Sequence, residues 1–351
     1  MSRFFSSKYA SLVPYVPGEQ PRDRKYVKLN TNESPFSPSP AVIRAVLEEA
    51  ASLQLYSDPE ASILISKLAE TYDVEPERII ATNGSDEVLD FAFNAFCDNA
   101  HPIVFPDLTY GFYSVFADKL SIPYEEIPLK DDFTIDVNDY IGINKNIVIA
   151  NPNAPTGIAL PLSDIERIVA SNPDNVVIID EAYVDFGGES AIKLTERYGN
   201  LLVVQTFSKS RSLAGGRLGY ALASAEIIAD LNRIKYSTNP YNINRMTLAS
   251  AEATLAHDEV CAARCAEIAA TRTYTAAELQ KLGFTLTDSK TNFLFARPAN
   301  GDAATMYAEL RKRGILVRYF SGARVREYLR ITVGTREQMD ALLCAVREIL
   351  G

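Results

Sequence analysis

Five short apolar runs restrict the fold of this chain more than any other feature. Each holds four to six residues and is apolar without alternation, which indicates strands that are covered on both faces. Such strands are typical of a mostly parallel sheet flanked by helices, so we expect an α/β fold. The runs are Pro102–Phe105, Asn146–Ala150, Val176–Asp180, Leu201–Thr206 and Leu218–Ala223.

Helical patterns lie before and between these runs. Ser39 is a good N-cap and is followed by a proline and by an apolar helix face. Residues 85–97 are apolar on nearly all sides, which predicts a deeply buried helix. Ser163 and Glu166 have the spacing of a capping box and predict a helix over 163–170.

The chain has 351 residues, more than one core usually serves, so we expect more than one domain. We predict an N-terminal arm over residues 1–35, a large domain over 36–240 and a smaller α+β domain over 241–351 that packs with the arm. An Ala-rich region, 244–282, predicts one long helix or two abutting helices. The remaining predicted elements are strands over 292–297, 315–318 and 328–333, a helix over 302–313, and a last helix with a capping box of Thr335 and Gln338.

The composition excludes several classes of function. The net charge of −10 argues against a nucleic-acid or anionic-membrane surface. Only two histidines are present, His101 and His257, which nearly excludes a zinc site built on several histidines, and we expect no metal site. The four cysteines contain no CxxC pair, so reduced thiols and a cytoplasmic location are expected. No apolar run reaches 18 residues, and the proline-broken first 26 residues are expected to form an extended arm rather than a signal peptide.

Lys209 lies just beyond the carboxyl end of the run Leu201–Thr206, among small hydroxylated residues and eight positions before Arg217. A lysine in this setting can act as a reactive amine, because a nearby cation helps to keep it partly neutral. Thr206, Ser208 and Arg217 suit the binding of phosphate oxygens. This stretch alone leaves open the alternative of an ordinary lysine in a surface loop.

Asp180 ends the run Val176–Asp180. It is therefore expected at the carboxyl end of a buried strand, where open α/β sheets bind ligands. A buried carboxylate needs a cation or a proton donor as its partner. A protonated pyridine nitrogen, a magnesium ion in a nucleotide site and a structural ion pair all meet that need.

Two further loops are suited to binding. Asn153 lies in the loop 150–157, where two prolines, two asparagines and a glycine fix an irregular backbone at another strand end. Gly84 precedes the predicted buried helix, whose free backbone amides make a ready phosphate cradle. Neither a P-loop motif nor GxGxxG occurs, so a P-loop nucleotide site and a Rossmann dinucleotide site are both disfavoured.

Together these stretches resemble the aspartate-aminotransferase-like (fold type I) pyridoxal-phosphate enzymes and, within them, the histidinol-phosphate aminotransferase family. The resemblance implies a large domain with a seven-stranded sheet, pyridoxal 5′-phosphate as cofactor, and a homodimer. It extends over almost the whole chain and rests on the motifs LNTNESP (29–35), YSDP (56–59), NGSDE (83–87), PDLTY (106–110), NPNAPTG (151–157), DEAYVDF (180–186), TFSKSRSLAGGRLGY (206–220), KTNF (290–293) and YLRITVGT (328–335).

The resemblance assigns the cofactor contacts. Lys209 is implied as the Schiff-base lysine, which also moves the proton between Cα and C4′, and Asp180 as the partner of the pyridinium nitrogen. Tyr183 is implied to hydrogen-bond the phenolic oxygen of the ring, and Tyr110 to stack on the ring. The residues implied for the phosphate are Gly84, Ser85, Asp86, Thr206, Ser208 and Arg217, together with Tyr56 from across the dimer interface.

The resemblance also assigns a substrate pocket. Arg330 is implied to hold the anionic group of the substrate, with Arg318 as a helper. Three further residues are implied to line the same pocket: Tyr15, Glu33 and Asn292.

Two details of the motifs stay open. In many relatives an asparagine directly precedes Pro-Thr-Gly and bonds the ring oxygen, but here Ala154 has that place. Either Asn153, one position earlier, takes over the contact, or Tyr183 alone makes it. Arg324 and Arg326 are expected to be solvated, and an extension of the anion pocket is the alternative.

The activity implied by the resemblance is transfer of an amino group from L-histidinol phosphate to 2-oxoglutarate, in histidine biosynthesis, by two successive half-reactions. Aromatic amino-acid transamination is one alternative, and decarboxylation like that of the threonine-phosphate decarboxylases is another. A non-catalytic protein that acts by interaction is disfavoured, because Lys209, Asp180 and Arg217 are all intact.

Overall fold

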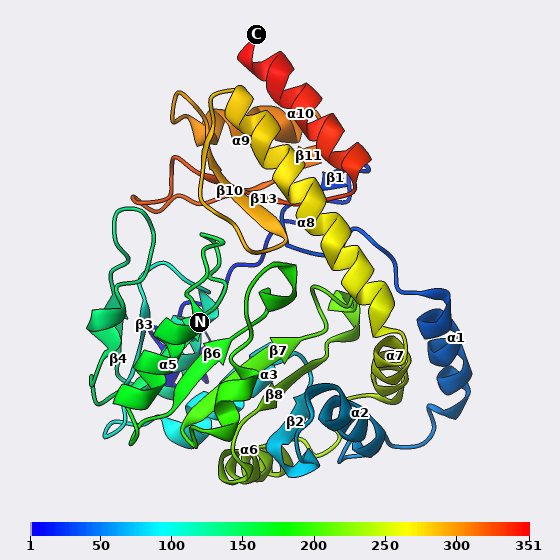
Figure 1. Cartoon of the computed structure of the whole chain (residues 1–351), viewed down its shortest axis with the longest axis vertical. Helices are drawn as coiled ribbons and strands as arrows, with labels where there is room; N and C mark the ends of the chain where they lie inside the picture. Colours follow the sequence, from blue (N-terminus) through cyan, green and yellow to red (C-terminus); the bar gives the residue numbers. More distant parts are fainter. Residues whose placement is uncertain (1) are drawn as a thin grey trace.

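A seven-stranded sheet lies at the centre of the computed structural model, which describes residues 2–351 (Figure 1). The strand order is β2-β8-β7-β6-β5-β3-β4, and all pairs are parallel except those that β8 makes with β2 and β7. The mostly parallel α/β sheet that the sequence predicts is therefore confirmed. Its strands are β2 (Ile79–Thr82), β3 (Ile103–Pro106), β4 (Tyr124–Ile127), β5 (Asn146–Ala150), β6 (Val177–Asp180), β7 (Leu201–Thr206) and β8 (Gly219–Leu222).

The two edge strands, β2 and β4, lie outside the five apolar runs of the sequence. Three of the four residues of β4 are exposed, so this strand has no apolar run to recognise. β2 is buried along its whole length, but its four residues are too few to distinguish a strand from a piece of helix.

Helices cover both faces of the sheet, because alternate residues of a strand point to opposite sides. On β6, Ile178 enters an apolar cluster with α3, α4 and α6, whereas Ile179 enters a second cluster with α1, α2, α5 and α7. The expected two-sided burial of the strands is thus observed. These helices are α1 (Pro40–Glu49), α2 (Ser62–Tyr72), α3 (Ser85–Phe96), α4 (Phe112–Leu120), α5 (Leu162–Ser171), α6 (Ala225–Thr238) and α7 (Arg245–Leu255).

A second sheet, antiparallel and four-stranded with the order β12-β13-β10-β9, forms the C-terminal part of the molecule. The Ala-rich region is two helices, α7 and α8, which meet near His257. α7 packs against α1 and α2, and α8 runs on to the smaller sheet (Figure 1). The boundary between residues 240 and 241 stays a prediction, and the packing of α7 favours a division along α8. The elements are α8 (Asp258–Lys281), β9 (Thr285–Leu286), β10 (Phe293–Arg297), α9 (Ala303–Lys312), β12 (Arg318–Tyr319), β13 (Leu329–Thr332) and α10 (Arg336–Leu350).

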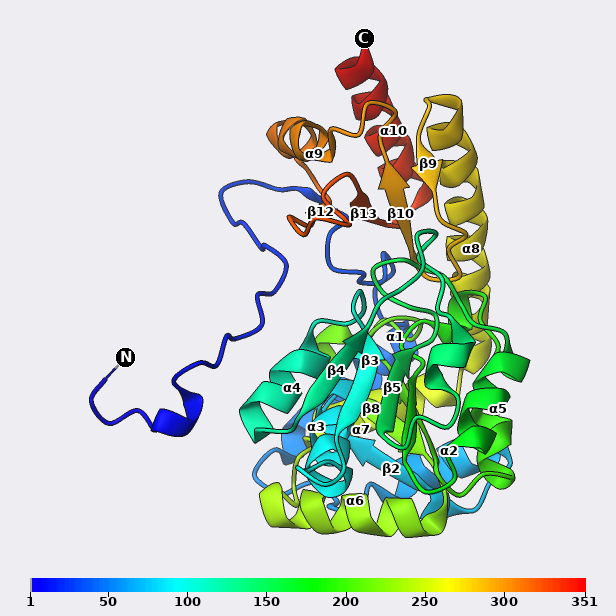
Figure 2. The same ribbon diagram turned by 90° about the vertical axis from the view of Figure 1, so that its left-hand side faces the viewer.

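The strand predicted over 315–318 is divided at Val317 into β11 (Ile315–Leu316) and β12. β11 pairs in parallel with β1 (Val27–Lys28), so the N-terminal segment crosses to the C-terminal part of the molecule. The residues before β1 extend away from the body in Figure 2. Short 3-10 helices complete the chain: η1 (Ser7–Tyr9), η2 (Ala50–Ser52), η3 (Pro76–Arg78), η4 (Val137–Tyr140), η5 (Val184–Phe186), η6 (Ile192–Glu196) and η7 (Ala214–Gly216).

Two of the three predicted helix caps are confirmed. Ser39 caps α1 with its side chain, and Thr335 forms the capping box of α10. The capping box predicted at Ser163 is wrong, because α5 begins at Leu162 with Pro161 as its N-cap. Ser163 therefore lies inside the first turn. No helix within residues 2–351 has the length and apolar character needed to cross a membrane.

Candidate active site

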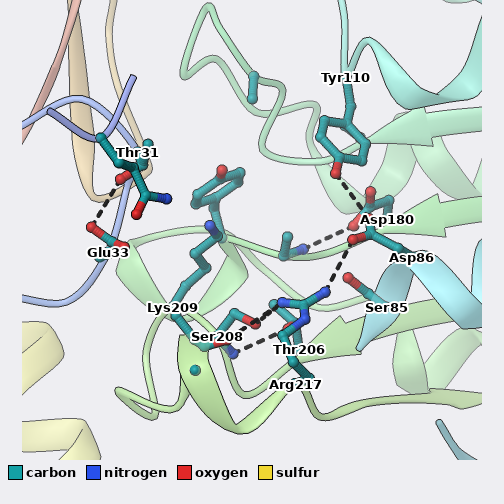
Figure 3. Close-up of a pocket in the computed structure, with 17 residues that line it drawn as sticks. Thr31, Glu33, Ser85, Asp86, Tyr110, Asp180, Thr206, Ser208, Lys209 and Arg217 are labelled. Atoms are coloured by element: carbon teal, nitrogen blue, oxygen red, sulfur yellow. Dashed lines mark hydrogen bonds and ion pairs between the residues drawn. The ribbon is translucent and has the colours of Figure 1, made fainter. Parts of the chain in front are cut away.

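A cavity of about 400 Å³ opens at the carboxyl ends of β5, β6 and β7 (Figure 3). The last residues of these strands, Ala150, Asp180 and Thr206, all line it. The carboxyl ends of parallel strands meet at one edge of a sheet, so residues far apart in the sequence converge there. The predicted site residues that line the cavity are Glu33, Ser85, Asp86, Tyr110, Asp180, Tyr183, Thr206, Ser208, Lys209 and Arg217.

Several lining residues were not singled out in the sequence. Most have small apolar side chains, which carry no chemical signal in a sequence. Gln20 and Thr31 come from the N-terminal segment, whose position over the cavity depends on the β1–β11 pairing. The full set is Gln20, Thr31, Ala150, Ala154, Ala182, Ala214 and Gly215.

Asp180 is buried at the floor of the cavity. Its Oδ2 accepts a hydrogen bond from the Tyr113 hydroxyl at 2.8 Å, and its Oδ1 accepts one from the amide of Ala182 at 3.2 Å. Burial raises the pKa of Asp180 to about 6, although both hydrogen bonds act in the opposite direction. The carboxylate is therefore held in place, and it forms no ion pair with any cation among residues 2–351. Tyr113 was missed in the sequence, because it lies inside α4 with no motif around it.

Lys209 points into the cavity from the loop after β7 (Figure 3). Its Nζ lies 5.7 Å from the centroid of the Tyr183 ring. The hydroxyl of Tyr183 accepts a hydrogen bond from Asn32 Nδ2 at 2.9 Å. Asn32 was also missed as a site residue, although it stands in the motif LNTNESP. The structure thus brings a lysine amine and a fixed phenol to one side of the cavity.

The start of α3 forms one end of the cavity, and its N-cap, Gly84, makes no side-chain cap. The first-turn amides are therefore open to an anion. Gly84 has a φ of 87°, and a Cβ there would lie 2.6 Å from Nη2 of Arg217. A Cβ on Gly219 would lie 2.2 Å from the amide nitrogen of Ser85. Only glycine permits these close approaches, so the arrangement of α3, β8 and Arg217 depends on both positions.

Arg217 joins the predicted phosphate residues to one another. Its Nη2 lies 3.1 Å from Oδ2 of Asp86, and its Nη1 lies 3.5 Å from Oγ of Ser208. The other oxygen of Asp86 accepts a hydrogen bond from the Tyr110 hydroxyl at 2.8 Å (Figure 3). Burial, followed by the charge of Asp86, raises the pKa of Tyr110, so this phenol stays a proton donor.

Arg330 lies on β13 and does not line the cavity. The ring of Phe293 lies between its guanidinium and Tyr183, which does line the cavity. The guanidinium of Arg330 stands 5.4 Å from the centroid of Phe293, which in turn contacts Tyr183 edge-to-face at 5.2 Å. The only hydrogen bond of the Arg330 side chain to residues 2–351 is from Nη2 to the Asn30 carbonyl, at 3.2 Å, and its Nε is buried without an acceptor. Oδ1 of Asn292 is likewise buried without a donor among these residues. Burial lowers the pKa of Arg330, as expected for a cation that lacks an acidic partner.

Three other predicted substrate residues surround this arginine or the cavity. Arg318 pairs with Arg330 across β12 and β13, and its guanidinium bonds backbone carbonyls of the N-terminal segment at 3.3 and 3.4 Å. Tyr15 stacks on Phe112 at 4.4 Å between ring centroids. Glu33 accepts hydrogen bonds from Lys28 at 2.6 and 2.7 Å; these lower its pKa, although burial alone would raise it.

Three predicted cofactor residues are not among those that line the cavity: Gly84, which directly precedes α3, and Asn153 and Tyr56. The amide nitrogen of Asn153 donates to the Leu108 carbonyl at 2.9 Å and to the Thr156 hydroxyl at 3.1 Å, so both of its protons are used elsewhere. Tyr56 is 79% exposed and stacks on Tyr241 with 4.5 Å between ring centroids. Asn153 therefore fixes the surrounding loops, and Tyr56 faces solvent in the single chain.

The comparisons with known proteins agree closely. Residues 24–346 match the family aminotransferase class I and II. A histidinol-phosphate aminotransferase from Marinomonas sp. is 50% identical over 99% of this chain and 100% of its own length. One from Brachyspira hyodysenteriae is 47% identical over 100% of this chain and 99% of its own length.

The chain belongs to the histidinol-phosphate aminotransferase family. The crystal structure of the histidinol-phosphate aminotransferase from Sinorhizobium meliloti in complex with pyridoxal-5′-phosphate shares the fold. Its TM-score is 0.90 and its identity 24%, over 100% of this chain and 98% of that chain. The family and fold expected from the sequence motifs are thus confirmed. The protein is an aminotransferase.

Proposed function

We propose that this aminotransferase transfers the amino group of L-histidinol phosphate to 2-oxoglutarate. The observation that carries the proposal is the partly buried side chain of Arg330, whose Nε is buried without an acceptor among residues 2–351. A buried cation without a counter-ion costs free energy, so an anionic substrate group is favoured there. Histidinol phosphate offers a phosphate and 2-oxoglutarate offers a carboxylate, and a planar guanidinium can bond either anion with two parallel hydrogen bonds.

The residues around the cavity fit pyridoxal phosphate. The uncapped start of α3 and Arg217 suit its phosphate, and the buried carboxylate of Asp180 suits a protonated ring nitrogen. Lys209 supplies an amine on the same side of the cavity. When bound, the cofactor supplies an aldehyde that reacts with amines and a ring that withdraws electrons from Cα.

The chain's own residues then have distinct tasks. Tyr113 holds the carboxylate of Asp180 in place. The ionised carboxylate stabilises the positive charge of the ring nitrogen and so keeps that nitrogen protonated. Lys209 removes the proton from Cα of the substrate and delivers it at C4′, as a general base and then a general acid. Tyr183 donates to the ring oxygen. We assign this contact to Tyr183 alone, because both amide protons of Asn153 are used by Leu108 and Thr156.

Assembly as a homodimer belongs to the same proposal, as does a cytoplasmic location. The segment around Tyr56 exposes several large apolar side chains that would be costly to leave in water. Tyr56 itself is held by its stack on Tyr241, yet its side chain faces outward. In a dimer it would reach the phosphate end of the partner's cavity. The exposed large apolar residues between positions 43 and 63 are Ile43, Leu47, Leu53, Leu55, Tyr56 and Ile63, and Tyr241, which stacks on Tyr56, is exposed as well.

The substrate assignment is tested by comparing amino donors at saturating 2-oxoglutarate. We expect kcat/KM for histidinol phosphate to exceed that for histidinol by at least about tenfold, because an unfilled anion site leaves the Arg330 guanidinium without an anionic partner. Equal kcat/KM values for the two alcohols would remove the phosphate site from the proposal. A preference for phenylalanine would then assign the enzyme to aromatic amino acids, and release of CO₂ would assign it to the decarboxylases.

A further inference from the structure

Arg324 lies in the loop 320–328 that joins β12 to β13, the strand that carries Arg330. Its guanidinium donates hydrogen bonds to three acceptors in the loops that follow β3 and β4 of the large sheet. Nη1 donates to Oδ2 of Asp107 at 2.8 Å, and Nη2 donates to the carbonyls of Leu129 and Lys130 at 2.9 and 2.8 Å. Arg324 is exposed, as the sequence-based expectation of a solvated side chain requires, but its guanidinium is also bonded to three acceptors. The alternative, an extension of the anion pocket, is disfavoured, because both Nη groups already donate to these acceptors.

The receiving side of this contact is itself fixed. Oδ1 of Asp107 accepts a hydrogen bond from the amide of Leu129 at 2.9 Å, so one carboxylate ties together the loop after β3 and the turn at 129–134. Asp107 also stands three residues before Tyr110, which lines the cavity. A hydrogen bond between Asn153 and the Leu108 carbonyl anchors the residues between them. Arg324 thus bonds a rigid part of the cavity wall.

Aromatic packing accompanies these hydrogen bonds. Phe133, from the turn at 129–134, packs edge-to-face against Phe295 of β10 at 5.6 Å and against Tyr328, the residue before β13, at 5.2 Å. The guanidinium of Arg324 lies 5.8 Å from the same Phe133 ring. The side chains of Arg324 and Asp107 are 36% and 24% exposed, so the ion pair alone would contribute little. The contact matters for orientation rather than for stability, because three acceptors in fixed positions hold the guanidinium of Arg324 in one place.

We propose that Arg324 is a positioning residue that holds Arg330 at the distance from Lys209 that the substrate requires. Arg330 lies on β13 of the smaller sheet, whereas Lys209 lies in the loop after β7 of the large sheet, so no local structure sets their separation. A substrate must span from the amine at Lys209 to its anionic group at Arg330. The contact between Arg324 and Asp107 joins the two sheets within six residues of Arg330 in sequence, and so it limits how far the anion site can shift. The proposal rests on the assignment of Arg330 as the anion-binding residue.

The test uses Arg324→Ala, with Arg326→Ala as the matched control, since Arg326 is an exposed arginine two residues along the same loop. We expect Arg324→Ala to raise KM for histidinol phosphate and to lower the preference for it over histidinol by about 10- to 100-fold. The visible absorbance of the bound cofactor and the cofactor's Kd should stay at the wild-type values, because none of the residues assigned to the phosphate belongs to the smaller sheet or to the loop of Arg324. A loss of kcat for both alcohols in equal proportion, with the preference retained, would overturn the proposal.

Asp107→Asn tests the same contact from the other side and covers the case of an unstable Arg324→Ala protein. We expect the two substitutions to be non-additive, so that Asp107→Asn changes the preference much less in the Arg324→Ala background. Multiplicative effects would mean that the residues act separately and would overturn the proposal.

The half-reaction with 2-oxoglutarate tests the role of Arg324 without any amino donor. Wild-type and variant proteins are loaded with pyridoxamine phosphate and mixed with 2-oxoglutarate in single turnovers. We expect Arg324→Ala, but not Arg326→Ala, to need about 10-fold or more 2-oxoglutarate for half-maximal rate. If wild-type protein shows no preference for the phosphorylated alcohol, the donor assignment fails, and this measurement still decides the role of Arg324. An unchanged 2-oxoglutarate requirement would refute it.

Discussion

The hydroxyl of Tyr113 donates a hydrogen bond to Oδ2 of Asp180 at 2.8 Å, from a helix that packs beside the strand ends. Together with the amide of Ala182, it fixes the carboxylate while leaving the cavity side for a ligand. Burial outweighs these two hydrogen bonds and raises the pKa of Asp180 to about 6. A protonated ring nitrogen would place a positive charge beside Asp180 and would therefore lower the pKa of this carboxyl group.

Asp180→Asn should therefore retain the cofactor but lose most of its turnover. A charge-assisted hydrogen bond contributes about 1.5–3 kcal/mol, so we expect a fall in kcat of roughly 10- to 150-fold. Absorbance of the bound cofactor and steady-state kinetics measure the two properties. Wild-type turnover in Asp180→Asn would contradict the role of this carboxylate.

The cofactor-free protein should lose stability as the pH rises from about 4 to about 6. Because the pKa of Asp180 is raised from 3.8 to about 6, the folded chain binds this proton more tightly than the unfolded chain does. The folded state is thus favoured below pH 4, and the contribution of up to about 3 kcal/mol is lost by about pH 6. Urea unfolding of wild-type and Asp180→Asn protein at each pH measures this contribution as the difference between their free energies of unfolding. Parallel stability curves for the two proteins would rule out the raised pKa.

Lys209→Ala should abolish turnover, because no other lysine amine lines the cavity within residues 2–351. Borohydride should bleach the yellow wild-type enzyme and fix the cofactor to Lys209, as peptide mass analysis would detect. Lys281→Ala, which removes an exposed lysine on α8, serves as the control and should react like wild type. Full activity in Lys209→Ala would exclude it as the catalytic lysine.

Arg330→Lys should weaken both half-reactions. Lysine keeps the charge but loses the planar fork, so we expect a loss of roughly 1.5–3 kcal/mol in each half-reaction. Single turnovers with histidinol phosphate and with 2-oxoglutarate separate the two effects. If only one half-reaction is weakened, the two anions do not share this arginine.

Hybrid dimers test whether Tyr56 acts in the partner's active site. A dimer of one Tyr56→Phe subunit and one Lys209→Ala subunit should contain one intact cavity, because the Lys209→Ala subunit still supplies Tyr56. Purified hybrids should then show about half the wild-type activity and one high-affinity cofactor site. The control is a hybrid of Lys209→Ala with wild type. A fully active monomer in sedimentation would contradict the shared site.

Much of this site could be predicted because its signals are local. The apolar runs that end at Asp180 and Thr206 predict strand ends, and strand ends of a parallel sheet converge. Gly84 and Gly219 show a different kind of dependence, because the reason for a glycine at each position appears only when β8 and α3 meet. The Ser163 cap failed for a local reason, since Pro161 starts the helix earlier than the motif implies.

The sequence by itself determined the five inner strands of the large sheet, the loops at their carboxyl ends and the family that the motifs resemble. Those properties depend on residue periodicity and on neighbours a few positions apart. The tertiary structure decided that Asn153 bonds its own loops, that Tyr113 holds Asp180, that Arg330 has no acidic partner in the described part of the chain and that Arg324 has three acceptors. A side chain's partners are set by which segments the folded core brings together, and Arg324 and Asp107 are 217 positions apart. No local sequence pattern predicts such a contact, because the two side chains come within hydrogen-bonding distance only after both sheets have formed.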